Sequence, residues 1–292
     1  MKYLTSFSLP GERAEAKYLL SNRKLDMSCY ATNNVYPFKL FPQKRLTHIT
    51  FEPLTIFYGG NGSGKSTLLN LIAEKWHLHR LCSFQRTPFF DDYLSLCEGE
   101  GDPSRYSSII TSDAVFDYLL DLRAINDGVD RNRNAVFEEW RQRSDPNAHM
   151  QLRSLEEYEE FKEFLEAKRL SMNKYTERRI ARNVIGRSNG ESAYAYFTEL
   201  IKEDALYLLD EPENSLSAEL QQRLAQFLED SVRFFGCQLV ICTHSPFLLS
   251  LKGARIYNLD HSPVDVCRWT ELGAVQAYRS LFVSRSSDFE ST

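Results

Sequence analysis

Apolar residues along this chain follow two different spacings, and the alternation between them predicts its elements. An apolar run at residues 54–58 (LTIFY) ends in glycines and is followed by a helical run, KSTLLNLIAEKW. Two later apolar runs, at residues 205–209 and 238–243, are separated by a segment of helical spacing. Strands that alternate with helices predict an α/β fold with a mixed sheet flanked by helices.

The first 52 residues show a different pattern. Strand-like runs at residues 2–8 (KYLTSFS) and 45–51 (RLTHITF) flank a helical segment at residues 13–20. Strands joined in this way, before any strand–loop–helix unit, predict an antiparallel β portion that leads into the main sheet.

Helical spacing dominates residues 102–187, where apolar residues recur at three- and four-residue steps. Turn signals at residues 126–128 (NDG) and 144–147 (SDPN) predict at least three helical pieces. We therefore expect a core formed by residues 1–101 and 188–292, with a helical insertion at 102–187. The polar tail SRSSDFEST is expected to be disordered.

Composition narrows the class of protein. With 292 residues, 42% of them hydrophobic, the chain can bury a sizeable core. A net charge of −5 gives no general attraction to nucleic acid or anionic membranes. The sequence has no 18-residue apolar run, no basic leader pattern and no paired cysteine motif. We expect a cytoplasmic protein without membrane insertion, with reduced cysteines.

The strongest motif is YGGNGSGKST, which fits G-x-x-x-x-G-K-[ST] directly after an apolar strand. Glycines in such a P-loop, or Walker A motif, let backbone N–H groups surround phosphate oxygens at the start of a helix. Lys65 would reach the β- and γ-phosphates of a nucleotide, and the Ser66 hydroxyl would ligate Mg²⁺. The predicted nucleotide-binding residues of this loop are Gly59, Gly60, Asn61, Gly62, Ser63, Gly64, Lys65, Ser66 and Thr67.

A second motif, ALYLLDEPENS, places two acids at the end of an apolar strand. Strand ends open onto the ligand crevice of an α/β sheet. Asp210 is expected to hold Mg²⁺, as in a Walker B motif, and Glu211 to polarise the attacking water.

The segment Ser188-Asn189-Gly190-Glu191 lies before a helical run and upstream of the acidic strand. Here the chain resembles the ABC ATPase family, whose signature reads LSGGQ. Ser188 matches the signature serine, Gly190 its second glycine and Glu191 its glutamine, whereas Arg187 and Asn189 depart from it. The same four residues also fit a capping box, with Ser188 as the N-cap, and both interpretations can hold together. Similar S-x-G-E forms occur in SMC and RecF-like relatives.

The resemblance extends from about residue 47 to residue 260, with the motifs in the same order along the chain as in the family. His244, in THSP after an apolar strand, corresponds to the family's switch histidine, and residues 213–217 correspond to its dimer-contact loop. Gln85 corresponds to the glutamine that ligates Mg²⁺. Three upstream aromatic residues, Tyr36, Phe38 and Phe41, are candidates for stacking on adenine. The phrases LLDEPENSLS and THSPFLL resemble small stand-alone bacterial ATPases of this type.

The resemblance implies a P-loop NTPase fold of the ABC ATPase type, and an ATPase that uses ATP and Mg²⁺. It further implies a head-to-tail homodimer in which Ser188, Asn189 and Gly190 of one subunit cover nucleotide held by the other. Glu211, His244 and Lys65 are the expected catalytic residues. The S-N-G-E form favours a DNA-linked or defence-type switch with an effector protein, and the alternative is the nucleotide-binding subunit of a membrane transporter.

Nucleic acid is a further partner to test. Residues 168–187 carry seven basic residues against one acid. Such a stretch can bind phosphate backbones. It can equally complement a helix dipole, because residues 154–167 are rich in acids.

Overall fold

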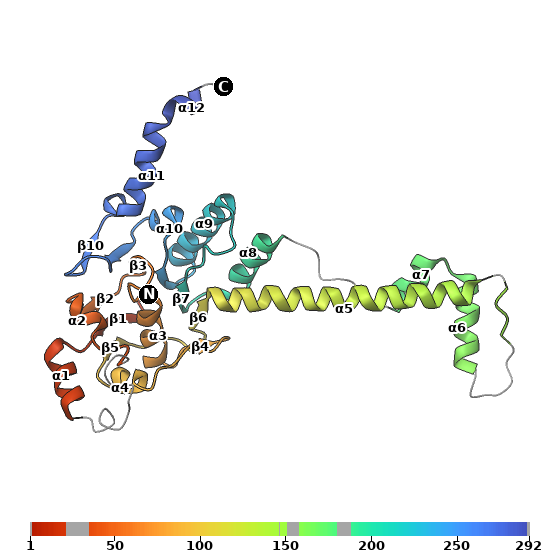
Figure 1. Cartoon of the computed structure of the whole chain (residues 1–292), viewed down its shortest axis with the longest axis horizontal. Helices are drawn as coiled ribbons and strands as arrows, with labels where there is room; N and C mark the ends of the chain where they lie inside the picture. Colours follow the sequence, from red (N-terminus) through yellow and green to blue (C-terminus); the bar gives the residue numbers. More distant parts are fainter. Residues whose placement is uncertain (1, 22–34, 146, 151–157, 180–187, 291–292) are drawn as a thin grey trace. The chain divides into compact units, whose positions relative to one another are not determined.

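The computed structural model describes residues 2–21, 35–145, 147–150, 158–179 and 188–290. The chain divides into two compact units. The core unit comprises Met1–Val115 and Asn189–Thr292, and the helical unit comprises Phe116–Ser188. Helix α5 (Ser112–Ser144) begins in the core unit and continues through the boundary (Figure 1).

Seven strands form the main sheet of the core unit, in the order β10-β9-β3-β8-β7-β6-β4. All neighbouring pairs are parallel except β10 with β9. The central strands are apolar and buried along their length, as expected for parallel strands covered on both faces. The strands are β3 (Leu54–Tyr58), β4 (His79–Arg80), β6 (Ser108–Thr111), β7 (Leu206–Asp210), β8 (Gln238–Cys242), β9 (Arg255–Asn258) and β10 (Asp265–Cys267).

A smaller antiparallel sheet has the order β2-β1-β5, from β1 (Leu4–Ser8), β2 (His48–Thr50) and β5 (Glu98–Gly101). This confirms the antiparallel portion predicted for the N-terminal residues. Buried Gln238 joins the two sheets, because its side-chain oxygen accepts bonds from Tyr3 N and Leu4 N, both at 2.7 Å. Its amide nitrogen donates to the carbonyl oxygens of Leu4 and Glu52.

Helices of the core unit pack against the strands of the main sheet. Helix α3 packs against β7 and β8, whereas α9 packs against β8 and α8. Ser217 caps α9, because its side-chain oxygen accepts a bond from Leu220 N. The core-unit helices other than α5 are α1 (Glu12–Ser21), α2 (Leu40–Gln43), α3 (Lys65–Lys75), α4 (Phe90–Ser95), α8 (Asn189–Leu200), α9 (Ala218–Phe234), α10 (Pro246–Leu249), η3 (Trp269–Glu271), α11 (Gly273–Ser284) and α12 (Ser286–Glu290).

The helical unit contains most of α5, together with α6 (Tyr158–Arg169) and α7 (Met172–Glu177). Arg143, near the end of α5, forms ion pairs with Glu139 and with Glu163 of α6. Trp140 donates from its indole nitrogen to the carbonyl oxygen of Leu170 at 3.1 Å. Tyr175 of α7 donates from its hydroxyl to Glu139 Oε1 of α5 at 3.3 Å, so these contacts join the three helices of the unit.

Two sequence predictions about helices are wrong. The turn expected at residues 126–128 is absent, because α5 runs without a break from Ser112 to Ser144. A glycine inside a helix costs about 1 kcal/mol, less than the cost of ending and restarting a helix. The tail expected to be disordered forms α12 up to residue 290.

The boundary of the insertion also differs from the one drawn at residue 102. Strand β6 and the first turn of α5 lie in the core unit, whose first segment extends to Val115. Strand β6 is short, and it joins the sheet because its apolar pair Ile109 and Ile110 is buried beside β7. A four-residue strand gives too weak a periodic signal to be separated from the helical segment that follows.

Candidate nucleotide-binding and hydrolytic site

The register of three adjacent strands places the predicted motifs at one edge of the sheet. Phe57 of β3 and Asp210 of β7 both pair with Cys242 of β8. Because the strands are parallel, the residues that follow them leave the sheet side by side. The P-loop follows β3, Glu211 follows β7, and His244 follows β8.

The P-loop needs its glycines for close approach and for backbone conformation. A methyl group at Gly59 would lie 2.6 Å from the Ser63 hydroxyl oxygen, closer than side chains tolerate. Gly64 has φ +98° as the N-cap of α3, a conformation that L side chains rarely adopt. Within the loop, Gly59, Ser63, Lys65 and Thr67 are buried, Gly60 and Gly64 are partly buried, and Asn61, Gly62 and Ser66 are exposed.

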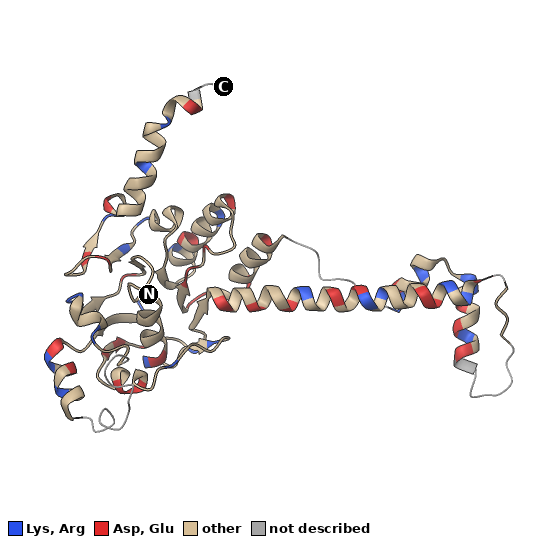
Figure 2. Cartoon of the chain, in the orientation of Figure 1, with Lys and Arg blue, Asp and Glu red and all other residues tan. Residues whose placement is uncertain are grey.

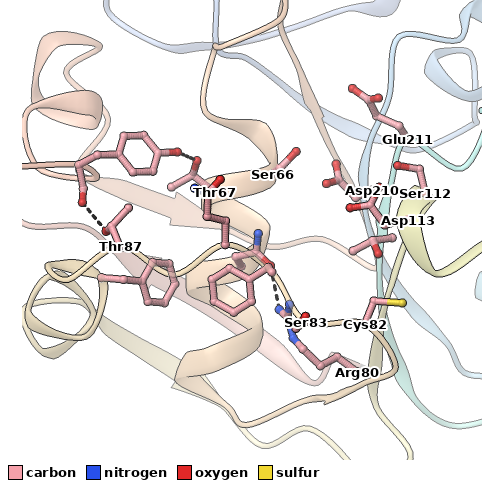
Figure 3. Close-up of a pocket in the computed structure, with 16 residues that line it drawn as sticks. Ser66, Thr67, Arg80, Cys82, Ser83, Thr87, Ser112, Asp113, Asp210 and Glu211 are labelled. Carbon is pink, nitrogen blue, oxygen red and sulfur yellow. Dashed lines mark hydrogen bonds between the residues drawn. The ribbon is translucent and has the colours of Figure 1, made fainter. Parts of the chain in front are cut away.

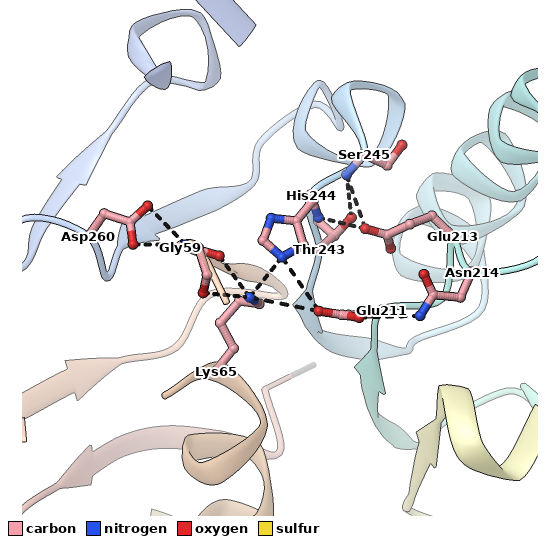
Figure 4. A network of polar contacts seen from close by, with 10 residues as sticks. Gly59, Lys65, Glu211, Glu213, Asn214, Thr243, His244, Ser245 and Asp260 are labelled. Carbon is pink, nitrogen blue, oxygen red and sulfur yellow. Dashed lines mark hydrogen bonds and ion pairs between the residues drawn. The ribbon is translucent and has the colours of Figure 1, made fainter. Parts of the chain in front are cut away.

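Lys65 is the centre of a polar network (Figure 4). Its side chain is 5% exposed, and its ammonium donates to the carbonyl oxygens of Gly59 at 2.7 Å and Gly60 at 3.2 Å. The same nitrogen lies 2.8 Å from His244 Nε2 and 3.8 Å from Glu211 Oε1. His244 Nε2 is 3.5 Å from Glu211 Oε1. The three residues predicted to be catalytic thus converge on one point from three different strand ends.

Glu211 is held in an uncommon backbone conformation. Its φ of 49° lies in the left-handed region, which is unfavourable for residues other than glycine. The strain is fixed by Glu211 N donating to Cys242 O at 2.9 Å, and by Asn214 Nδ2 donating to Glu211 Oε2 at 3.2 Å. Strained residues of this kind concentrate at functional sites, which agrees with the role expected for Glu211.

Asp210 lines a cavity of about 590 Å³ together with Ser66, Thr67, Gln85 and Glu211 (Figure 3). Burial raises the pKa of the Asp210 carboxyl to about 6, although a hydrogen bond from Ser66 opposes the rise. Its Oδ1 atom is buried and has no hydrogen-bond partner among the described residues. A carboxylate oxygen left unpaired beside a serine hydroxyl matches the hard oxygen ligands that Mg²⁺ requires.

Of Gln85 and the three upstream aromatic residues, only some line the cavity. Gln85 lies in the loop between β4 and α4 and lines the same cavity as Ser66 and Asp210. Phe38 and Phe41 are core residues, 4% and 0% exposed, and pack in the hydrophobic cluster. Tyr36 is 39% exposed, lines the cavity, and its hydroxyl contacts the Thr67 hydroxyl. Of the three, Tyr36 is therefore the one with an accessible ring.

The predicted signature lies at the start of α8. This helix begins at Asn189, so Ser188 immediately precedes it, as both the signature and the capping-box interpretation require. A methyl group at Gly190 would lie 2.9 Å from Leu220 Cδ1 and 3.1 Å from the carbonyl oxygen of Ser215. Glycine is thus needed for close packing of α8 against the segment that follows Glu211. Arg187 lies outside the described residues.

Several residues at the site were not found from the sequence. Asp260 accepts bonds from the P-loop nitrogen of Gly60 at 2.8 and 2.9 Å, and it comes from the end of β9, next to β3. Ser112 and Asp113 line the cavity because β6 ends beside β7. The order of strands in the sheet brings these residues to the site, and no local motif marks them.

The basic stretch of residues 168–187 is partly engaged within its own unit. Lys168 donates to the carbonyl oxygens of Asp145 and Ala148. Arg178 pairs with Glu166, and Arg179 pairs with Glu163 and Glu166. Figure 2 shows that Lys and Arg alternate with Asp and Glu along α5. Residues 180–187 lie outside the described part, so nucleic-acid binding stays a prediction.

Comparison with known proteins gives one family match. Residues 113–250 match a family described as "AAA domain, putative AbiEii toxin, Type IV TA system". This range includes the acidic strand and His244 but not the P-loop. No curated protein sequence matches the chain. No helix of the described residues is long and apolar enough to cross a membrane.

Several solved structures are similar at low identity. The SMC head domain from Thermotoga maritima is 14% identical, covering 91% of this chain and 99% of that one, with a TM-score of 0.41. A dimeric ATP-binding cassette bound to ADP and Pi is 16% identical, covering 76% and 89%, with a TM-score of 0.36. An ABC transporter classed as metal-chelate type is 17% identical, covering 81% and 80%, with a TM-score of 0.38.

The fold conclusion rests on the molecule's own features. A P-loop faces an acidic strand end across β8 in a mixed sheet flanked by helices, with a separate antiparallel sheet, as predicted. The acidic strand end and His244 lie within the residues that the family model matches. Together these features support a P-loop ATPase fold.

Proposed function

We propose that the chain binds MgATP at the P-loop and hydrolyses it in a head-to-tail homodimer, as a nucleotide-dependent switch. The observation that carries this proposal is the convergence of Lys65, Glu211 and His244 within 3.8 Å of one another. A cation, a carboxylate and an imidazole at a P-loop are the groups that position and polarise a water beside a γ-phosphate.

The roles of the residues follow from where they lie. The glycine-rich loop and the N-terminus of α3 bind the phosphates, with Lys65 neutralising their charge. Ser66, Asp210 and Gln85 would hold Mg²⁺, which supplies charge neutralisation between the phosphates when bound. Glu211 orients and polarises the attacking water, and His244 contacts the γ-phosphate. Tyr36 is the aromatic residue that contacts adenine.

The proposed mechanism completes each site with residues of the other subunit. Lys65, Glu211 and His244 form the polar network beside the P-loop, and among the described residues α8 adds no member to it. Ser188, Asn189 and Gly190 lie at the start of α8, where a serine hydroxyl and the N-terminal end of a helix suit an anion. In the proposed dimer these residues cover the γ-phosphate bound by the other subunit, so hydrolysis depends on assembly.

A pair of variants tests the shared site. Ser188→Arg should bind ATP as a monomer but lose ATP-dependent dimerisation and hydrolysis, because the bulky arginine side chain blocks the approach of the other subunit's P-loop. Lys65→Ala should bind ATP poorly. Mixing the two chains produces a dimer with one intact composite site, which should restore up to about half the activity per dimer. Light scattering and phosphate release measure both effects, and a fully active Ser188→Arg monomer would refute the composite site.

The switch is proposed to act on an effector protein in a defence system. The S-N-G-E form of the signature and the matched family, whose description names a toxin–antitoxin system, support this context. A tagged Glu211→Gln chain, locked with ATP, should retain the effector on purification from its host, and Lys65→Ala should not. Equal recovery with both variants would contradict nucleotide-controlled binding.

A further inference from the structure

Glu213 connects two loops of the site. One carboxylate oxygen of Glu213 accepts hydrogen bonds from His244 N at 2.6 Å and Ser245 N at 3.1 Å (Figure 4). The other, Oε2, is buried and has no hydrogen-bond partner among the described residues. A charged, partly buried carboxylate is costly unless it is paired, so its contacts with the His244 loop fix the position of that loop.

Glu213 lies in a short, tightly folded segment between β7 and α9. Asn214 N donates to Glu211 O at 3.1 Å, and Leu216 N donates to Glu213 O at 3.0 Å. Ser215 has a φ of 69°, in the left-handed region. These bonds make residues 211–216 a single turn structure, in which Asn214 holds the Glu211 carboxylate and Glu213 holds the His244 backbone.

The opposite side of this turn contacts the start of α8. The Gly190 position lies so close to the carbonyl oxygen of Ser215 and to Leu220 that a methyl group there would be crowded by both. The segment is therefore packed between the helix that begins with the signature and the loop that carries His244. Ser215, which packs against Gly190, is separated from Glu213 by Asn214 alone, so the two residues belong to the same turn.

We infer that Glu213 is a positioning residue for His244, which makes the place of this imidazole depend on the segment 213–217 and on α8. The inference rests on the proposed function and adds a positioning residue to it. The Glu213 carboxylate ties the 213–217 segment to the backbone of His244 and Ser245, so the place of the imidazole beside the nucleotide depends on this carboxylate.

Three variants test this role. Glu213→Ala removes the acceptor, whereas Glu213→Gln keeps a side-chain oxygen that accepts the same backbone bonds. Glu229→Ala is the matched control. Glu229 accepts a bond from Lys252 N at 2.7 Å, so it also joins α9 to the loop after α10, and among the described residues it has no hydrogen bond or ion pair with the nucleotide site. Steady-state hydrolysis, binding of a fluorescent ATP analogue and thermal unfolding are measured for each.

The expected pattern separates positioning from stability. Glu213→Ala should lower kcat about 10- to 100-fold with KM and analogue affinity changed less than about twofold, since only the transition-state geometry is lost. Glu213→Gln should recover to within about threefold of wild type, and Glu229→Ala should lower Tm without changing kcat. If Glu213→Ala does not fold, Glu213→Asp, one methylene shorter, should lower kcat in the same way with KM unchanged.

Contrary outcomes are distinct. If the wild-type chain hydrolyses ATP and Glu213→Ala retains its kcat within about twofold, Glu213 does not position His244 although the proposed function stands. Equal losses of kcat in Glu213→Ala and Glu229→Ala would assign Glu213 a structural role only and overturn the inference. A wild-type dimer without hydrolysis would instead reject the proposed function.

Discussion

The nucleotide site and the helical unit use charged side chains in opposite ways. At the nucleotide site, Lys65, Glu211 and His244 converge, and Asp210 has a buried oxygen without a partner among the described residues. In the helical unit, Arg143 and Arg179 each face acids, and the Arg179 guanidinium also lies 3.9 Å from the centre of the Tyr175 ring. The difference lies in what surrounds the groups: the unpaired Asp210 oxygen lines a cavity that can hold a ligand, whereas the two arginines pair with acids of their own unit.

The largest expected effect comes from removing one charge at the nucleotide site. Glu211→Gln keeps the shape of the side chain and the bond from Asn214, but it loses the charge that polarises water. We expect kcat for ATP hydrolysis to fall about 10²- to 10⁴-fold, with ATP binding preserved. The variant should accumulate as a nucleotide-bound dimer on size-exclusion chromatography. Phosphate release at the wild-type rate would assign the catalytic base to another residue.

An intermediate effect is expected in the helical unit, on stability rather than activity. Arg143→Met removes pairs to Glu139 and Glu163 and should destabilise the unit by about 1 kcal/mol, because these groups are partly exposed. Hydrogen exchange in α6 should accelerate while the basal ATPase rate stays the same. Arg141→Met, which removes an exposed ion pair with Glu138 on the same helix, is the comparison variant. Equal losses of ATPase activity in Arg143→Met and Glu211→Gln would contradict a purely structural role for the Arg143 pairs.

The ion pair of Arg143 with Glu163 should also make the stability of the helical unit depend on pH. The hydrogen bond from Arg143, the largest cause, lowers the pKa of Glu163 from its ordinary 4.5. A depressed carboxyl pKa stabilises the folded chain above pH 4.5, and that stability is lost as pH falls through the lower folded value. The difference in hydrogen exchange between wild type and Arg143→Met should therefore shrink on acidification below about pH 4.5. A constant difference across that range would show that Arg143 acts through packing alone.

The smallest expected effect concerns nucleic acid. Lys168, Arg178 and Arg179 are engaged within the helical unit, which leaves Arg169 and Lys174 as the other basic residues of the stretch that the structure describes. We expect weak binding to short DNA duplexes at low salt that falls steeply as salt rises. Arg169→Gln with Lys174→Gln should reduce it further, measured by fluorescence anisotropy. Binding that is insensitive to salt would contradict a phosphate-backbone contact.

The sequence alone determined the P-loop, the acidic strand end and the histidine after β8. Each of the three is a local pattern in which an apolar strand is followed directly by residues of recognisable chemistry. These residues are Gly59–Ser66, Asp210–Glu211 and Thr243–His244. The antiparallel β portion was likewise readable from alternating residues near the N-terminus. The predicted turn within α5 is wrong because helix cooperativity outweighs one internal glycine. The prediction of a disordered tail is wrong as well, since α12 forms with local contacts from Arg285 to Asp288 and from Phe282 to Phe289.

Only the tertiary structure decided which of these groups meet. Strand order and register bring Lys65, Glu211 and His244 together across 179 positions of sequence, and place Asp260 on the P-loop nitrogen of Gly60. The fold also buries Phe38 and Phe41 and leaves Tyr36 accessible, a choice that three similar aromatic residues could not reveal. Glu213 shows the same limit: its acidity is plain in the sequence, but its bonds to the His244 loop exist because β7 and β8 are neighbours in one parallel sheet.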